Sequence, residues 1–133
     1  AGAHRRMIAF DTSFLIDYLD EQPVAREFIE AHQDQPLHAP AQALFETYRG
    51  GARTQGEAGV DRVRQALEFL EPLPFSEAAA NRAARVEAQL LDDGNDINVA
   101  DVVVAGTCLH HGADLVTDDS HFDHVDGLEL IQY

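Results

Sequence analysis

The chain has 133 residues, enough for one domain with a sizeable hydrophobic core, and its 45% apolar residues are ordinary for a globular protein. Its charge is not ordinary, because 24 acidic residues outnumber 9 basic ones, all arginine, and give a formal net charge of -15. A single cysteine, Cys108, excludes an intramolecular disulfide, and no segment approaches the ~20 apolar residues of a membrane span, so we expect a cytoplasmic protein with no membrane association.

Short strands and helices are expected to alternate along the chain. The apolar run 7–10 predicts a buried strand that ends at Asp11, and Thr12 and Ser13 can begin a helix over 12–19. Further elements are expected as a helix at 24–32, a strand at 37–39, a helix from residue 40, a helix at 60–70, a strand at 72–75, a helix from residue 76 to about 91, a helix from Asn98 to 111, a strand at 115–117, a turn or short helix at 119–124 and a strand at 128–131.

This alternation predicts an α/β fold. We expect a three-layer α/β/α sandwich around a central, mostly parallel sheet of four to five short strands, with right-handed crossovers. Residues 7–133 would form a single domain, and residues 1–6 an irregular N-terminal extension or a remnant of cloning. Gly50 and Gly51 are expected to weaken the end of the helix that begins at residue 40, and 56–59 is expected to be a break.

Carboxylates follow two of the predicted strands. Asp11 comes directly after the first strand, and Asp118 and Asp119 follow the strand that ends at Thr117. In open parallel sheets, sites form beyond the carboxyl ends of the strands. Carboxylates brought together there would repel one another unless a cation lay between them, and hard oxygen ligands suit Mg²⁺ or Mn²⁺.

Two predicted helices supply further acids. Glu46 lies in the helix that begins at residue 40, and Asp101 lies on the first turn of the apolar helix after Asn98. Each acid also has a simpler interpretation: Asp11 and Asp119 can cap helices, Asp101 can favour a positive helix end, and Glu46 can be an exposed helix residue. The hypothesis of a metal site therefore depends on all four acids occurring together.

The ordered set of segments resembles the PIN-domain family. Residues 8–16 (IAFDTSFLI) are similar to the opening strand, acid, hydroxyl residue and apolar helix of that family, and Glu46 resembles its second acid. Residues 101–105 (DVVVA) resemble the helix with the third acid, residues 116–122 (VTDDSHF) the closing signature, and residues 127–131 the last strand. The chain departs from the family at Asp118, where Asn or Arg is commoner; the added charge would strengthen metal binding or weaken the approach of RNA.

The resemblance extends to the VapC toxins and implies a function. It implies an endoribonuclease, a hydrolase of RNA phosphodiester bonds that uses Mg²⁺ or Mn²⁺, forms a homodimer and is inhibited by a VapB-type antitoxin. The catalytic and metal-binding residues would be Asp11, Glu46, Asp101 and Asp119. Thr12, Ser13, Thr117 and Asp118 would surround the ligands, although helix capping is the simpler role for the three hydroxyls.

Contact with a polyanionic substrate is the least evident part of this interpretation. Nucleic-acid-binding proteins usually show a basic patch, and the sequence has none. Arg49 follows Glu46 by three residues and can contact a phosphate or form an ion pair, and Arg53 would share that face if the helix continued past the glycines. His121 and His124 are interpreted as surface residues.

Two interpretations of the acidic charge and two alternative functions stay open. The acids could bind cations or basic partners, but their spread along the chain favours adaptation to a salty cytoplasm, and hence a halophilic protein. The chain could be a PIN-like nuclease of RNA processing rather than a toxin, or a catalytically silent RNA- or protein-binding module. Receiver domains and P-loop nucleotidases are poor alternatives because both need a lysine, which the chain lacks.

Overall fold

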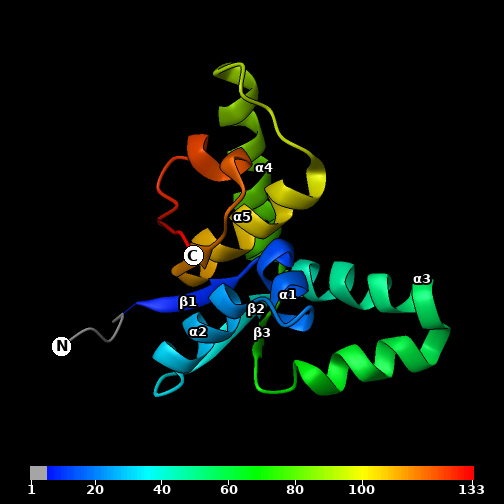
Figure 1. Ribbon diagram of the computed structural model, residues 1–133. Helices are drawn as coiled ribbons and strands as arrows, with labels where there is room; N and C mark the ends of the chain where they lie inside the picture. The colour runs from blue at the N-terminus through cyan, green and yellow to red at the C-terminus, as the bar shows by residue number, and fades with distance from the viewer. Residues whose placement is uncertain (1–5) are drawn as a thin grey trace.

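The computed structural model describes residues 6–133 as a five-stranded parallel sheet with helices on both faces (Figure 1). The strands are β1 (Met7–Phe10), β2 (Leu37–Pro40), β3 (Glu71–Leu73), β4 (Ala113–Val116) and β5 (Leu130–Ile131). The helices are α1 (Thr12–Leu19), α2 (Pro23–His32), α3 (Ala41–Ala66), α4 (Glu77–Asp92), α5 (Val99–His111) and the short 3₁₀ helix η1 (Ser120–His124). The sheet order is β3-β2-β1-β4-β5, and every pairing is parallel, so the predicted α/β sandwich is confirmed.

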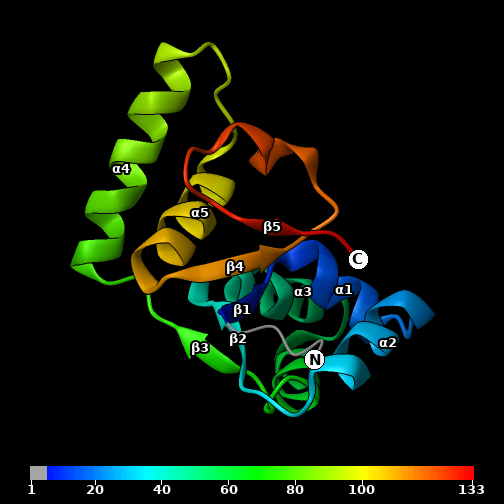
Figure 2. The ribbon, with the colours of Figure 1, turned by 90° about the vertical axis from the view of Figure 1, so that its left-hand side faces the viewer.

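Two hydrophobic cores lie on opposite faces of the sheet. Side chains alternate along a strand, so Ile8 and Phe10 of β1 pack with α1, α2 and α3, whereas Ala9 packs with α4 and α5. In Figure 2, α4 and α5 lie on one side of the sheet, and α1, α2 and α3 lie on the other. Burial on both faces explains why the strands are short apolar runs rather than alternating sequences.

The centre of the sheet determines where the candidate site lies. β1 pairs with β4 over its whole length, with Phe10 opposite Val116. The residues that follow these two positions are Asp11 and Thr117, and both therefore leave the same edge of the sheet side by side. The amide of Asp11 still donates to the carbonyl of Val116, at 3.4 Å.

Helix α3 folds back on itself as a helical hairpin. The backbone reverses at Gln55 and Gly56, where Gly56 has a φ of 62°, so a break is present but is shorter than the expected 56–59 and begins one residue earlier. Gly50 and Gly51 do not mark the end of this helix as expected, because the helix continues through both. The reason is packing: a Cβ on Gly51 would lie 2.6 Å from the carbonyl oxygen of Gly59, so the two arms approach closely only because glycine has no side chain.

Other boundaries differ from the predicted ones by a few residues. The second arm of α3 resumes directly after Gly56 and ends at Ala66, rather than running from residue 60 to 70. The last strand is confined to Leu130–Ile131, the residues that pair with β4. The expected extension at residues 1–6 lies, except for Arg6, outside the described residues. Among the described helices, none combines the length and apolar character that a membrane crossing requires.

Candidate metal centre

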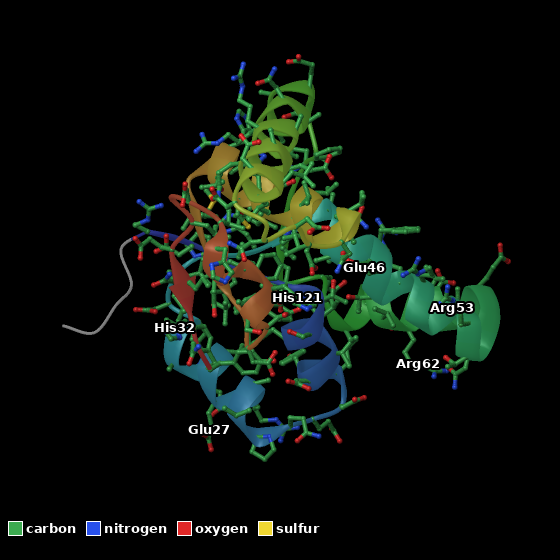
Figure 3. The ribbon with its side chains drawn as sticks, turned by 90° about the horizontal axis from the view of Figure 1, so that it is seen from above. Glu27, His32, Glu46, Arg53, Arg62 and His121 are labelled. Carbon is green, nitrogen blue, oxygen red and sulfur yellow. The ribbon has the colours of Figure 1, made fainter. Side chains whose placement is uncertain are left out.

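Four acidic residues that are far apart in the sequence converge beyond the carboxyl ends of β1 and β4. Asp11, Glu46, Asp101 and Asp119 all line one pocket of about 240 Å³, together with Thr12 and Ser13. Its apolar lining consists of Ile16, Val104 and Phe122. Seen from above, Glu46 of α3 and His121 of η1 lie near the middle of the molecule, whereas Arg53 and Arg62 lie farther out along α3 (Figure 3).

Asp11 is the most deeply buried of the four acids, with 4% of its surface exposed. It is the N-cap of α1 and accepts from the amide of Phe14 at 3.0 Å and from the Ser13 hydroxyl at 2.8 Å. The ring of Phe14 stacks on that of Phe10, with centroids 4.2 Å apart, and this contact holds the turn around Asp11 against the core. Asp11 is therefore both a helix cap and a wall of the pocket.

The carboxyl group of Asp11 is buried in the wall of the pocket. Burial raises the pKa of Asp11 above 3.8, and the nearby charge of Asp118 adds to the rise. Hydrogen bonds from Thr117, Phe14 and Ser13 oppose the rise but do not cancel it. The negative form is thus unfavourable in this pocket, and a bound cation would stabilise it.

Thr117 connects two of the acids through one hydroxyl group. It is 2% exposed, donates to Oδ2 of Asp11 and accepts from the amide of Asp119 at 2.9 Å. Because Thr117 directly follows β4, the sheet fixes its position. The hydroxyl therefore fixes the Asp11 carboxylate and the backbone of Asp119 relative to the edge of the sheet.

Asp101 is oriented by the residue that caps its helix. Asn98 is the N-cap of α5, as predicted, and accepts from the amide of Asp101 at 3.0 Å. In return, Nδ2 of Asn98 donates to Oδ2 of Asp101 at 2.8 Å. This reciprocal pair holds the acid on the first turn of a helix whose next turns are buried in the core.

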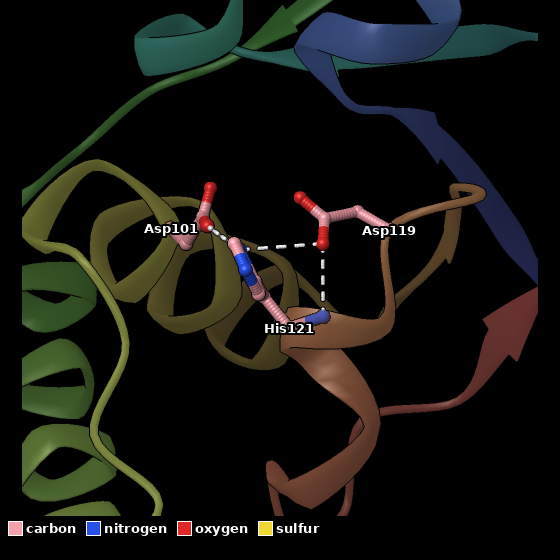
Figure 4. A group of neighbouring side chains, drawn as sticks. All are labelled: Asp101, Asp119 and His121. Carbon is pink, nitrogen blue, oxygen red and sulfur yellow. Dashed lines mark hydrogen bonds and ion pairs between the residues drawn. The ribbon is translucent and has the colours of Figure 1, made fainter.

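His121 joins the acids in the structure, although it was predicted only as a surface residue. Its side chain is 58% exposed, yet Nδ1 lies 3.2 Å from Oδ2 of Asp101 and 3.3 Å from Oδ1 of Asp119 (Figure 4). One ligand atom from each of the three residues lies within 4.8 Å of the other two. Asp119 caps η1 by accepting from the amide of His121 at 2.9 Å, and this cap turns the histidine toward the pocket.

Glu46 lies on the first arm of α3 and also lines the pocket. Its Oε1 accepts from the Thr12 hydroxyl at 3.1 Å, and its Oε2 lies 4.0 Å from Nη2 of Arg49. The Arg49 guanidinium also lies over the ring of Phe45, 5.4 Å from the centroid. Arg49 is therefore held beside Glu46 by a long ion pair and by its aromatic neighbour.

Of the other predicted residues, Thr12 and Ser13 line the pocket, whereas Thr117 and Asp118 border it. Asp118 is exposed, and its carboxylate accepts from the Ser13 hydroxyl at 3.1 Å, so Ser13 bonds to both Asp11 and Asp118. The three predicted hydroxyls thus each donate to an acid of this region, in addition to any role in capping. The negative charge of Asp118 near Asp11 adds to the repulsion that a bound cation would relieve.

Larger hollows lie elsewhere on the described surface but contain none of the four acids. One of about 530 Å³ is lined by residues of α1 and α2, including Tyr18 and Ile29, and one of about 350 Å³ adjoins it near Leu37. Their polar groups do not include a comparable set of ligands. The 240 Å³ pocket is the site that the chemistry favours, because its four carboxylates, with the imidazole of His121 beside two of them, are hard or borderline ligands for a divalent ion.

Comparison with known proteins identifies a family and several solved structures with a similar fold. The family model described as PIN domain matches residues 8–128. The fold is similar to VapBC2 from Rickettsia felis bound to a promoter DNA fragment, with a TM-score of 0.86, 18% identity, and coverage of 96% of this chain and 98% of that one. DNA-bound VapBC from Salmonella typhimurium has a TM-score of 0.84 and 19% identity, with coverage of 95% of this chain and 97% of that one. FitAcB from Neisseria gonorrhoeae has a TM-score of 0.80 and 21% identity, with coverage of 94% of this chain and 96% of that one. No curated protein sequence matches the chain.

Proposed function

Because the chain belongs to the PIN-domain family, we propose that it is an endoribonuclease that depends on Mg²⁺ or Mn²⁺ and hydrolyses RNA phosphodiester bonds. The convergence of Asp11, Glu46, Asp101 and Asp119 in one pocket supports this proposal above any other observation. The carboxylates of the pocket and the phosphates of an RNA backbone are both negative and repel one another, so a cation bound between them would allow the phosphate to approach.

The four acids would hold the ion or ions, each through a geometry fixed by its own element. Asp11 is oriented by Thr117 and Ser13, and Asp101 is oriented by Asn98. A metal bound here lowers the pKa of a coordinated water and neutralises charge that develops on the phosphate. The protein itself orients the ligands, and Val104 and Phe122 give the pocket a buried apolar lining.

We propose that the substrate approaches along α3. Residues 47–66 contain four arginines and only two acids, in a chain whose net charge is otherwise strongly negative. Arg49 and Arg53 lie three and seven residues after Glu46 on an unbroken helical arm, so they share its face at about 4.5 and 10.5 Å along the helix axis. In this proposal Arg49 would contact a phosphate of the substrate.

A toxin of a VapBC-type toxin–antitoxin pair is the biological role that we propose for this nuclease. The structural similarity to VapBC complexes over nearly the whole of each chain supports it. The partners would then be RNA, a VapB-type antitoxin and a second copy of this chain, in the cytoplasm. Expression should arrest growth, the Asp101→Asn variant should not, and a small antitoxin gene next to this one should restore growth.

Cleavage of a mixed structured RNA tests the chemistry directly. The assay is run in molar KCl with Mn²⁺, with EDTA, and with the Asp101→Asn variant; Asp92→Asn, which changes an exposed acid at the end of α4, is the matched control. We expect cleavage that requires Mn²⁺, persists in the control and is lost in Asp101→Asn. Folded protein that neither cleaves RNA nor binds Mn²⁺ would instead identify a catalytically silent binding module.

A further inference from the structure

The side chain of His121 lies in the centre without a packing role. It is 58% exposed, so it contributes little to the hydrophobic core, and the cap of η1 needs only its backbone amide. Any residue at this position could supply that amide. The imidazole nevertheless places Nδ1 between Oδ2 of Asp101 and Oδ1 of Asp119 (Figure 4).

We infer that His121 is a nitrogen ligand of the metal centre and gives it a preference for Mn²⁺ over Mg²⁺. This inference rests on the proposed function, because it uses the same carboxylates. It goes further by naming a ligand from outside the acidic set and by choosing between the two ions.

The two distances from Nδ1 of His121 to the carboxylate oxygens are compatible with one shared ion. Neighbouring ligands around an octahedral ion with bonds of about 2.1 Å lie roughly 3.0 Å apart. The two separations from Nδ1 of His121, 3.2 Å to Asp101 and 3.3 Å to Asp119, are close to that value. The three donors come from two elements, α5 and the segment from Asp119 through η1, and both are anchored in the core by Val104 and Phe122.

The chemistry of the donors favours a transition metal. Mg²⁺ takes oxygen ligands almost exclusively and retains several waters, whereas transition-metal ions accept imidazole nitrogen. A centre made only of carboxylates would accept Mg²⁺ and Mn²⁺ alike. One nitrogen among the oxygens lowers the relative affinity for Mg²⁺ and leaves Mn²⁺ well bound.

Pulsed electron paramagnetic resonance on the Mn²⁺-loaded full chain tests this ligation. Nitrogen-14 bound directly to Mn²⁺ produces a characteristic modulation, which we expect in the unmodified protein and in His124→Ala, and not in His121→Ala. His124 is the matched control because it is exposed on the same short helix, and the metal cluster does not include it. Circular dichroism establishes that each variant is folded.

Affinity measurements provide the second readout. By calorimetric titration, His121→Ala should bind Mn²⁺ about 10- to 100-fold more weakly, a loss of the size seen when metal-site support is removed. Binding of Mg²⁺ should change by about threefold or less, since the nitrogen contributes little to it. His121→Asp should bind both ions and lose the preference.

The outcomes separate this inference from the proposed function. One outcome is that the unmodified protein binds Mn²⁺ without the nitrogen modulation and that Asp101→Asn abolishes this binding. That result would overturn the role of His121 and leave the proposed carboxylate nuclease intact. Nitrogen modulation in a protein that cleaves no RNA would support the ligand and contradict the nuclease. Failure of the unmodified protein to bind Mn²⁺ would overturn both.

Discussion

Thr117→Val should weaken both the fold and the metal centre. Valine has nearly the shape of threonine, so the substitution removes the hydroxyl and leaves the packing in place. Two interactions are lost at once: the donation to Oδ2 of Asp11 and the acceptance from the amide of Asp119. Thr117 is 2% exposed, so water cannot easily replace the hydroxyl.

The magnitude follows from these two contacts. A hydrogen bond to a charged group contributes about 1.5–3 kcal/mol, and a backbone amide left without a partner costs about 1 kcal/mol or more. The Asp119 amide is only partly buried, so we expect the free energy of unfolding to fall by about 2–4 kcal/mol. That is a large fraction of the ~5–15 kcal/mol typical of a domain. Loss of support for Asp11 should also weaken Mn²⁺ binding by about 10- to 100-fold.

Urea unfolding at one fixed KCl concentration, followed by calorimetric titration with Mn²⁺, measures both effects. Thr117→Ser is the matched control, since it retains the hydroxyl and loses one methyl group at a cost of about 1 kcal/mol. The two variants should differ clearly in denaturation midpoint, with equal slopes. If Thr117→Val and Thr117→Ser had equal denaturation midpoints and equal Mn²⁺ affinities, the bridging role of the hydroxyl would be refuted.

Other perturbations test separate parts of the structure. Without divalent ions, the free energy of unfolding should fall as the pH rises from 3.8 through the higher folded pKa of Asp11, because the folded state binds that proton more tightly. Denaturation midpoints measured against pH should show this fall in the unmodified protein and not in Asp11→Asn. Stability should rise steeply with KCl because of the net charge of -15, and thermal melts that are equal in dilute buffer and molar KCl would contradict salt adaptation. Gly106→Ala should cost about 1–3 kcal/mol in urea melts, since its new Cβ would lie 2.5 Å from Cα and Cβ of Ala83 on α4. Gly50→Ala, with no atom within 4 Å of the added Cβ, should instead stabilise the helix by about 0.5–1 kcal/mol.

The sequence predicts the fold well where local patterns and tertiary packing agree. The apolar run before Asp11 and the one before Thr117 indicate buried strands, and parallel pairing then brings their ends together. Asn98 is recognisable as a cap because a long apolar helix follows it. In each case a short stretch of sequence determines both the element and the position of the polar residue at its end.

The position of His121 could not be predicted in this way. Its orientation depends on the single turn of η1 and on the distance between that turn and the first turn of α5, and neither follows from residue spacing. The pattern of Asp119 followed two residues later by histidine was visible, but an exposed histidine near an acid is common. Only the three-dimensional distances distinguish a ligand from a surface residue.

The requirement for glycine at position 51 in α3 could not be predicted for a similar reason. Gly50 and Gly51 look alike in sequence, and both have low helix propensity. A Cβ on Gly50 would meet nothing, whereas one on Gly51 would meet the backbone of Gly59. Helix propensity therefore gave the wrong expectation, because tertiary contact between the two arms determines where glycine is required.

The position of β4 beside β1 has a consequence for the timing of activity during synthesis. Asp119 follows Asp11 by 108 residues, so a ribosome adding about 5–20 residues per second needs roughly 5–20 s between them. For most of that interval the nascent chain lacks β4 and Thr117, and until its end it lacks the Asp119 wall of the pocket. If the chain has the nuclease activity proposed above, it would therefore stay inert beside the RNA of its own ribosome until nearly all of the domain has been made.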